Sequence, residues 1–274
     1  MQTFFDAHTH IHFPAYDVDR EDVLARAKAA GVKMITVGTQ WSTSYGAVEF
    51  AKAHPGYVWA TVGFHPAHFS ADWHHDKNEQ NETVREVFDA NKLRVIAKHP
   101  KVVAIGECGL DFYRDKSQAT RDSQREGFLA QIELAHEVKK PLMIHCRSAF
   151  TDLIEILKAN SSKLKAGAPG VIHFFSGAKD EAKKLLDMGF AFTFGGVVTF
   201  ARDYDEVIKM LPLEAILSET DSPYVAPAPY RGKRNEPAYV VEVVKKLAEL
   251  KGINTEEMAA NIFENAKRIF ALDA

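Results

Sequence analysis

The chain has 274 residues, of which 46% are hydrophobic and 26% charged, and its formal net charge is −3. The length matches the roughly 250 residues of one α/β barrel, and the composition is ordinary for a globular protein. These values exclude a protein that coats nucleic acid by bulk positive charge, and two cysteines exclude a disulfide scaffold.

Short apolar runs rich in β-branched residues alternate with longer amphipathic stretches along the chain. The predicted strands are 3–8, 32–38, 58–63, 102–107, 141–145, 170–175, 190–197 and 215–219. The predicted helices are 20–30, 43–53, 121–138, 149–159, 180–188, 204–210, 237–250 and 255–270. The polar segment 70–98 is interpreted as an elaborated loop followed by a helix.

Repeated alternation of strands and helices favours a parallel sheet, and about eight strands favour its closure into a single (β/α)8 barrel of the TIM type. A doubly wound open sheet stays as the alternative, because periodicity does not distinguish the two. No linker divides the chain, so we expect one domain over residues 1–274. The sequence contains no apolar run of membrane-spanning length and no signal peptide pattern. We therefore expect no membrane association and expect the protein to reside in the reducing cytoplasm.

Ionisable residues gather at the C-terminal ends of the predicted strands, which meet on one face of a parallel barrel. They are His8 and His10 on the first strand, His65 on the third, Glu107 on the fourth, His145 on the fifth, His173 on the sixth, and Asp221 just beyond the eighth. Imidazole and carboxylate groups bind divalent cations, and a carboxylate can bridge two ions about 3.5–4 Å apart. Buried ionisable groups are costly unless they are paired or bind metal, so this joint placement predicts a metal-dependent hydrolase.

Any one of these residues would be weak evidence, because a lone histidine at the end of a strand is usually a hydrogen-bonded structural residue. That structural role is expected for the other histidines outside the third-strand motif, namely His12, His54, His74, His75, His99 and His136.

The sequence resembles the TatD family of metal-dependent deoxyribonucleases, within the amidohydrolase superfamily. The matching stretches are FDAHTH (5–10), GFHP (63–66), AIGECGLDFY (104–113), PLMIHCR (141–147), IHFFSG (172–177), ETDSPY (219–224) and RGKRNEP (231–237). They follow the family order over nearly the whole chain. The chain departs from the family pattern at Ala67, Cys108 and Phe174, and none of these changes removes a ligand.

The resemblance implies a distorted barrel with two divalent cations, Mg²⁺, Mn²⁺ or Zn²⁺. One cation would be bound by His8, His10, Glu107 and Asp221, and the other by Glu107, His145 and His173. The resemblance also implies that His65 and Arg147 face a substrate phosphate, and that Asn235 helps to order the rim. Together with Tyr113, these three make up the expected substrate-binding residues.

The expected activity is 3′→5′ exonuclease cleavage of single-stranded DNA by a monomer or weak oligomer, with Asp221 and Glu107 as the catalytic residues and Asp221 as the proton acceptor. Arg114, Arg231, Lys233 and Arg234 are candidate backbone contacts on the rim, while a salt bridge stays the alternative for Arg147. Phe112 and Cys108 are expected to pack in the interior.

Two other functions stay open: an esterase or deacylase acting on aminoacyl-tRNA or a small ester, and a non-catalytic relict barrel. Glu107 without a lysine at the end of the fourth strand favours the nuclease, and the full ligand set disfavours the relict.

Overall fold

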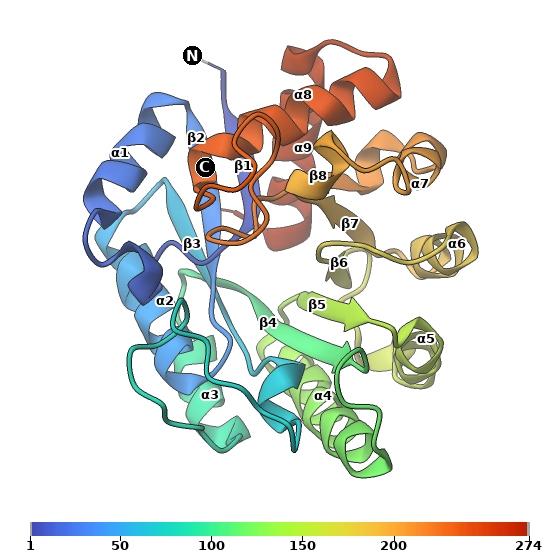
Figure 1. The fold of residues 1–274 in the computed structure, drawn as a ribbon. Coiled ribbons are helices and arrows are strands. Elements are labelled where there is room, and N and C mark those ends of the chain that lie inside the picture. The colour runs from blue at the N-terminus through green and yellow to red at the C-terminus, as the bar shows by residue number, and fades with distance from the viewer. Residues whose placement is uncertain (1, 273–274) are drawn as a thin grey trace.

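In the computed structural model, which describes residues 2–272, eight strands run in chain order around a nearly closed barrel (Figure 1). Each strand pairs in parallel with the next one along the chain. The strands are β1 (Phe4–Thr9), β2 (Val32–Val37), β3 (Val58–Val62), β4 (Val102–Asp111), β5 (Leu142–Arg147), β6 (Gly170–Ile172), β7 (Ala191–Phe194) and β8 (Ile216–Ser218).

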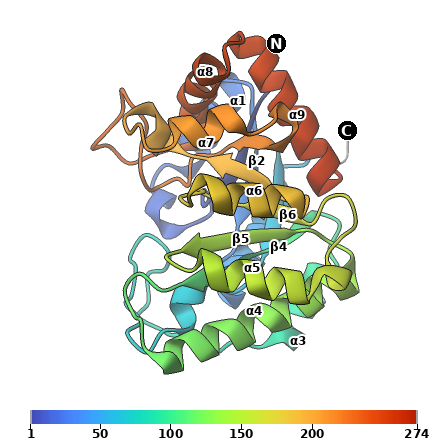
Figure 2. The same ribbon diagram turned by 90° about the vertical axis from the view of Figure 1, so that its right-hand side faces the viewer.

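Helices surround the strands on the outside of the barrel, as the two views in Figures 1 and 2 show. They are α1 (Arg20–Ala29), α2 (Trp41–Ala53), α3 (Ala90–Ala97), α4 (Gln118–Val138), α5 (Phe150–Ala159), α6 (Lys179–Asp187), α7 (Asp205–Met210), α8 (Val240–Lys251) and α9 (Thr255–Phe270). Helix α9 packs against β1 and β8, and so covers the place where the first and last strands meet. No helix within residues 2–272 is both long and apolar enough to cross a membrane.

The strands are buried along almost their whole length, β3 and β4 at every residue. Side chains fill the inside of the barrel and helices cover its outside, so both faces of each strand must be apolar. This explains the continuous apolar runs of the sequence. The (β/α)8 barrel is confirmed, and the open-sheet alternative is wrong.

The fourth strand is the main departure from the predicted elements. It was predicted to end at Glu107, but β4 continues to Asp111, so Glu107 lies within the strand. The pairing of β4 with β5 shifts register between Ile105 and Cys108. Gly106 lies between them with φ +154°, and a Cβ there would lie 2.3 Å from the carbonyl oxygen of Met143. Only glycine fits this close approach. The charged Glu107 directly after it led to the incorrect prediction that the strand ends there.

Strands β8 and β1 close the barrel through a short bridge between Thr9 and Ser222. The amide of Asp221 donates to the carbonyl oxygen of His8 at 2.8 Å. The buried Asp6 carboxylate accepts from the amide of Thr220 at 2.8 Å and from its hydroxyl at 2.5 Å. The first and last strands are thus joined by side chains and a few backbone bonds.

Residues 70–89, called the strap below, run along the rim between β3 and α3, in agreement with the predicted loop and helix. The Tyr224 hydroxyl donates to Asp76 at 2.7 Å, and the amide of Ala15 donates to the carbonyl oxygen of Asn78 at 3.2 Å. Glu79 accepts from the Thr39 hydroxyl. The strap is therefore attached to the loops that follow β1, β2 and β8.

Candidate active site

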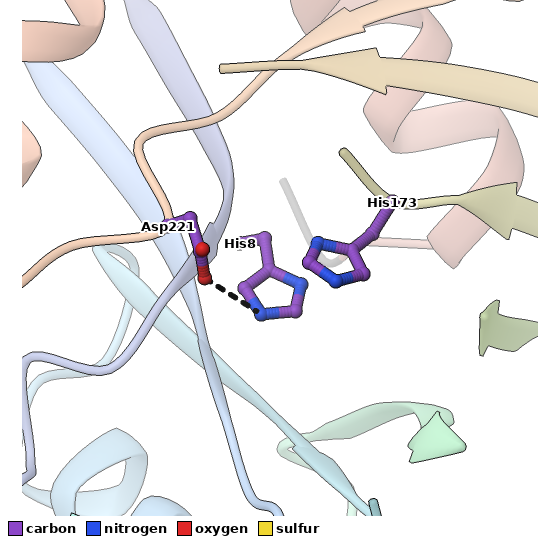
Figure 3. A group of neighbouring side chains, drawn as sticks. All are labelled: His8, His173 and Asp221. Atoms are coloured by element: carbon purple, nitrogen blue, oxygen red, sulfur yellow. Dashed lines mark ion pairs between the residues drawn. The ribbon is translucent and has the colours of Figure 1, made fainter. Parts of the chain in front are cut away.

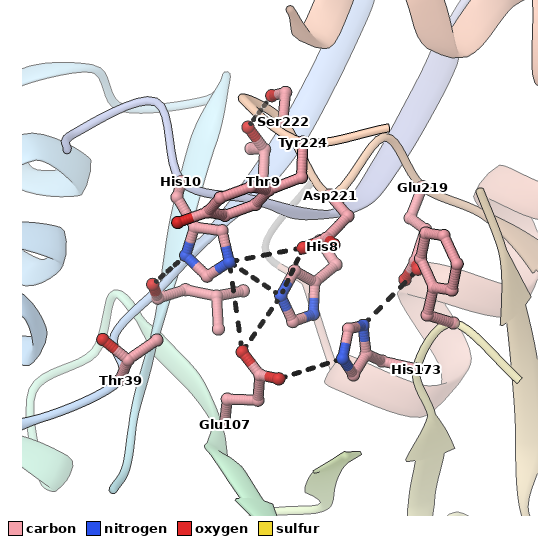
Figure 4. A network of polar contacts seen from close by, with 12 residues as sticks. His8, Thr9, His10, Thr39, Glu107, His173, Glu219, Asp221, Ser222 and Tyr224 are labelled. Carbon is pink, nitrogen blue, oxygen red and sulfur yellow. Dashed lines mark hydrogen bonds and ion pairs between the residues drawn. The ribbon is translucent and has the colours of Figure 1, made fainter. Parts of the chain in front are cut away.

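The six predicted ligands lie in one cluster at the C-terminal ends of the strands, and Figure 4 shows five of them, His8, His10, Glu107, His173 and Asp221. The cluster divides around Glu107, whose two carboxylate oxygens face different histidines. We call His8, His10, Asp221 and Oε2 of Glu107 the first group, and His145, His173 and Oε1 of Glu107 the second group.

In the first group, Nε2 of His8 and Nε2 of His10 lie 3.1 Å apart. Oε2 of Glu107 lies 3.4 Å from His8 Nε2 and 3.9 Å from His10 Nε2. Oδ1 of Asp221 lies 3.6 Å from His8 Nε2 and 3.4 Å from His10 Nε2. The ligand atoms of His8, His10 and Glu107 all lie within 4.8 Å of one another, close enough to bind one cation. Figure 3 shows Asp221 and His173 on either side of His8.

In the second group, Oε1 of Glu107 lies 3.0 Å from His145 Nδ1 and 2.9 Å from His173 Nε2. The two imidazole nitrogens lie 3.4 Å from each other. The ring of His173 also stacks on that of His8, with centroids 3.9 Å apart, so the two groups are in direct contact.

Contacts on the far side of three imidazoles leave one nitrogen of each facing the centre. Nδ1 of His10 lies 2.8 Å from the carbonyl oxygen of Val37. Nε2 of His145 lies 3.0 Å from Asp111 Oδ2, and Nδ1 of His173 lies 3.4 Å from Glu219 Oε1. In His10 and His145, an N–H directed at the outer oxygen leaves a bare nitrogen toward Asp221 or Glu107, an arrangement that a cation would stabilise. His173 makes only the longer contact with Glu219 and no hydrogen bond there.

Asp111 and Glu219 were not predicted from the sequence as part of the site. The available signal was spacing: Asp111 is four residues after Glu107 on one strand, and alternate residues of a strand share a face. Glu219 is two residues before Asp221, in the same motif.

The pKa values of the cluster are set by mutual charge. Burial alone would raise the pKa of Glu107, but the positive charges of His65, His173 and His8 hold it well below its usual value. Burial alone would lower the pKa of His173, but the charges of Glu107 and Glu219 raise it well above its usual value. Without metal, His173 therefore favours the protonated form beside the Glu107 carboxylate, and a cation can replace its proton.

His65 differs from the ligand histidines. Its Nδ1 accepts from the amide of Ala67 at 3.0 Å, so in a neutral ring the proton is on Nε2, 3.1 Å from Oε1 of Glu107. A protonated nitrogen has no lone pair for a cation. His65 is therefore placed as a hydrogen-bond donor beside the second group.

A cavity of about 540 Å³ opens over both groups, within the usual size of small-ligand pockets. Its floor contains His10, Glu107, His145, His173 and Asp221. The strap contributes Trp73, His74, Asp76 and Glu79 to one wall, and the other walls include Arg114, Arg147, Phe174, Tyr204 and Tyr224. Both cationic and acidic side chains thus line this cavity.

The predicted substrate-binding residues are found in different places. Arg147 lines the cavity, but it also makes the ion pair that was its alternative, with Asp111 at 2.8 Å. Tyr113 is mostly exposed and lies under the Arg147 guanidinium, 4.5 Å from ring centroid to Cζ.

Asn235 is fully buried and is not among the residues that line the cavity. Its amide instead donates to the carbonyl oxygens of Thr220 at 2.8 Å and Tyr224 at 2.6 Å, and so holds the loop that contains Asp221. Ordering of the rim, the other part of that prediction, agrees with these contacts.

Among the rim cations, Arg114 lines the cavity. Arg234 is held by Asp19 at 2.6 Å, and Arg231 lies over the ring of Phe200. Phe112 and Cys108 are buried, as predicted. His74, which was assigned a structural role, is exposed at the mouth of the cavity.

A parallel barrel whose strands end in a buried cluster of histidines and carboxylates is typical of metal-dependent hydrolases. A model of the family described as TatD related DNase matches residues 5–271. The chain belongs to this family and is a metal-dependent hydrolase that acts on ester bonds.

Relatives and solved structures agree with this assignment. The uncharacterised metal-dependent hydrolase YabD of Bacillus subtilis (strain 168) is 39% identical, over 98% of this chain and 99% of the relative. The 3′-5′ ssDNA/RNA exonuclease TatD of Pantoea ananatis is 36% identical, over 98% and 99%. The crystal structure of YjjV, a TatD homologue from Escherichia coli K12, matches with a TM-score of 0.83 and 28% identity over 98% of each chain. A TatD family hydrolase from Entamoeba histolytica shares the fold, with a TM-score of 0.80 at 22% identity and 98% of each chain covered.

Proposed function

We propose that this chain is a two-cation exonuclease that removes nucleotides from the 3′ end of single-stranded DNA. One observation carries the two-cation part: the two oxygens of Glu107 face two separate sets of ligand nitrogens. This is the arrangement expected of a carboxylate that bridges the ions of a two-metal hydrolase. The nuclease activity and its direction are supported by the relative of that printed name.

The donor set fits divalent cations. His8, His10, Asp221 and Glu107 Oε2 would hold the first, and His145, His173 and Glu107 Oε1 the second. Nitrogen and oxygen donors suit Zn²⁺ and Mn²⁺, and Mg²⁺ is the alternative that carboxylates favour. When bound, such cations lower the pKa of a water molecule and polarise a phosphoryl oxygen.

The side chains around the cations would orient the substrate and move its protons. Asp221 retains some solvent exposure beside His10 and would accept the proton of the attacking water. His65 and Arg147 would donate hydrogen bonds to phosphate oxygens that become more negative in the transition state. Asn235 and Tyr113 would act indirectly, because Asn235 holds the Asp221 loop and Tyr113 supports Arg147.

The direct test uses a 5′-labelled single-stranded DNA oligonucleotide, with Mg²⁺ or Mn²⁺ and with a chelator. We expect a ladder of products that shortens from the 3′ end, and no product with the chelator. RNA and duplex DNA of the same sequence measure the choice of nucleic acid. Glu107→Gln serves as the inactive control.

Two results would replace this proposal. Turnover of a chromogenic ester or an aminoacyl-tRNA, with no cleavage of DNA or RNA, would assign the same site to an esterase or deacylase. Inertness toward both substrate classes in the cation-loaded protein would favour a relict barrel.

A further inference from the structure

The carboxylate of Asp111 ends β4 beside the second group, and no role in the proposed reaction has been given to it. It is buried, and it pairs across the sheet with Arg147, since the two residues are register partners of β4 and β5. His145 lies two residues before Arg147 on β5, so both side chains of that strand point to the same side as Asp111. One carboxylate thus contacts both a ligand histidine and an arginine of the cavity wall.

Both oxygens of Asp111 are occupied by hydrogen-bond donors. Oδ2 lies 3.0 Å from His145 Nε2, 2.9 Å from Arg147 Nε and 2.8 Å from Arg147 Nη2. Oδ1 accepts from the amide of Tyr113 at 3.0 Å. An ionised carboxylate, which Asp111 is as the ion-pair partner of Arg147, can only accept hydrogen bonds.

This contact decides which nitrogen of His145 can bind a cation. Nε2 must carry a hydrogen to bond with Asp111, which leaves the lone pair of Nδ1 as the donor to a metal. Nδ1 is also the nitrogen that faces Glu107, at 3.0 Å. If the ring carried its proton on Nδ1 instead, His145 could not bind a cation in the second group.

The same carboxylate limits the motion of Arg147. Two of the donors of its guanidinium are directed at Asp111, and the guanidinium plane lies over Tyr113. The side chain of Arg147 is still 44% exposed and lines the cavity. Asp111 therefore links the side chain expected to contact a substrate phosphate to a histidine expected to bind a cation.

We propose that Asp111 is a positioning residue that fixes His145 with Nδ1 toward the cation of the second group and holds Arg147 at the wall of the cavity. The inference rests on the proposed function only in assuming that the second group binds a cation. Asparagine cannot replace this residue, because its NH2 group would face either the amide of Tyr113 or the donors of His145 and Arg147.

The test compares Asp111→Asn and Asp111→Ala with Asp115→Asn, a matched control four residues further on. Asp115 is also loaded with donors, since it accepts from the amide of Ser117 at 2.9 Å and from the hydroxyl of Ser70 at 3.1 Å, but it makes no contact with His145. Metal-free proteins are titrated with Zn²⁺ or Mn²⁺ against a chromogenic chelator, which measures the number of ions bound and their dissociation constants.

We expect both Asp111 variants to bind one ion about 10–100-fold more weakly than the wild type, the usual effect of losing an outer carboxylate. The other ion and the Asp115→Asn control should keep wild-type affinity. At saturating cation, the KM for a DNA oligonucleotide should also rise in the Asp111 variants, because Arg147 loses its support. Asp111→Asn should be no better than Asp111→Ala.

Unchanged affinities in folded Asp111 variants would overturn the inference, and so would a wild-type protein that binds no cation. A second measurement does not depend on the variants folding. The NMR signals of the ring nitrogens are recorded in zinc-loaded wild-type protein with ¹⁵N-labelled histidine, and the His145 signals are assigned as those missing from His145→Asn. We expect the proton of His145 on Nε2. A proton on Nδ1 would exclude the proposed role. Absence of nuclease activity with intact cation binding would contradict the proposed function alone.

Discussion

The two groups around Glu107 differ in what supports their histidines from behind. In the first group, His10 is held by the neutral carbonyl of Val37, and Nδ1 of His8 has no hydrogen-bond partner among residues 2–272. In the second group, Asp111 contacts His145 through a hydrogen bond, and the Glu219 carboxylate lies 3.4 Å from Nδ1 of His173, which like Nδ1 of His8 has no hydrogen-bond partner within residues 2–272. An anionic partner makes an imidazole a stronger ligand than a neutral one does. We therefore expect the second group to bind its cation more tightly, and the first to exchange its cation more readily.

The largest effect should come from Glu107→Gln, which changes the one residue that both groups share. An amide in this position brings one N–H group against the histidines of one group and removes the negative charge from both. We expect the rate of DNA cleavage to fall by about 10³-fold or more, and the affinity for both cations to decrease. Metal titration and end-labelled DNA cleavage measure this. Loss of only one cation would mean that Glu107 does not bridge the groups.

Asp221→Asn tests the first group alone. Removal of the proton acceptor should lower kcat by about 10²–10⁴-fold, the range of general-base effects. Since Asp221 contacts His8 and His10 and lies outside the second group, one cation should remain bound with wild-type affinity. Equal weakening of both cations would show that the two groups are not independent.

Removal of the cations should make stability strongly dependent on pH. The pKa of His145 is lowered by burial but raised overall by its hydrogen bonds to Asp111 and Glu107, and that of His173 is raised by neighbouring carboxylates. A histidine with a raised pKa stabilises the fold fully below its unfolded pKa of about 6.5, and this contribution is lost as pH rises through the folded value. The chelated protein should therefore lose stability above about pH 6.5.

Bound cations replace these protons, so the gap in Tm between loaded and chelated protein should widen from pH 6 to pH 9. Thermal unfolding with Mn²⁺ and with a chelator measures the gap. His8 and His65, whose pKa values burial lowers, affect stability only below about pH 6.5 and do not mask the trend. A gap that is constant with pH would contradict proton replacement.

Tyr224→Phe should have the smallest effect of these changes. Tyr224 lies beside His10 of the first group. The substitution removes the 2.7 Å hydrogen bond to Asp76 of the strap and leaves the ring beside His10. We expect a loss of about 0.5–1.5 kcal/mol in the free energy of unfolding, and cation affinities unchanged in both groups. Chemical denaturation measures the first, and the metal titration measures the second. A change in metal affinity would mean that the strap helps to shape the site.

The barrel and the ligand residues could be predicted because their signals are local. Most strands contain a short apolar run, and His8, His145 and His173 lie at the C-terminal ends of such runs. Asp111 and Glu219 were missed because a carboxylate in a motif looks the same whether it would bind metal or support a ligand. Only the distances between strands separate the two roles.

Contacts between distant loops were beyond the reach of sequence patterns. The bond between Tyr224 and Asp76 joins residues 148 apart in the chain, and nothing local to either residue predicts it. The burial of Asn235 behind the rim depends in the same way on how residues 220–236 fold back on β1 and β8.

The first group lies where β8 meets β1, so a cation bound there would also affect the closure of the barrel. His8 lies in the first strand, His10 directly follows it, and Asp221 follows the last strand. A cation bound by all three would therefore crosslink the barrel where these strands share a short bridge. The ion would then close a chain loop of more than two hundred residues, as a crosslink between the two ends of the fold does. Hydrogen exchange of β1 and β8 amides should accordingly speed up on chelation, more than that of β5 and β6.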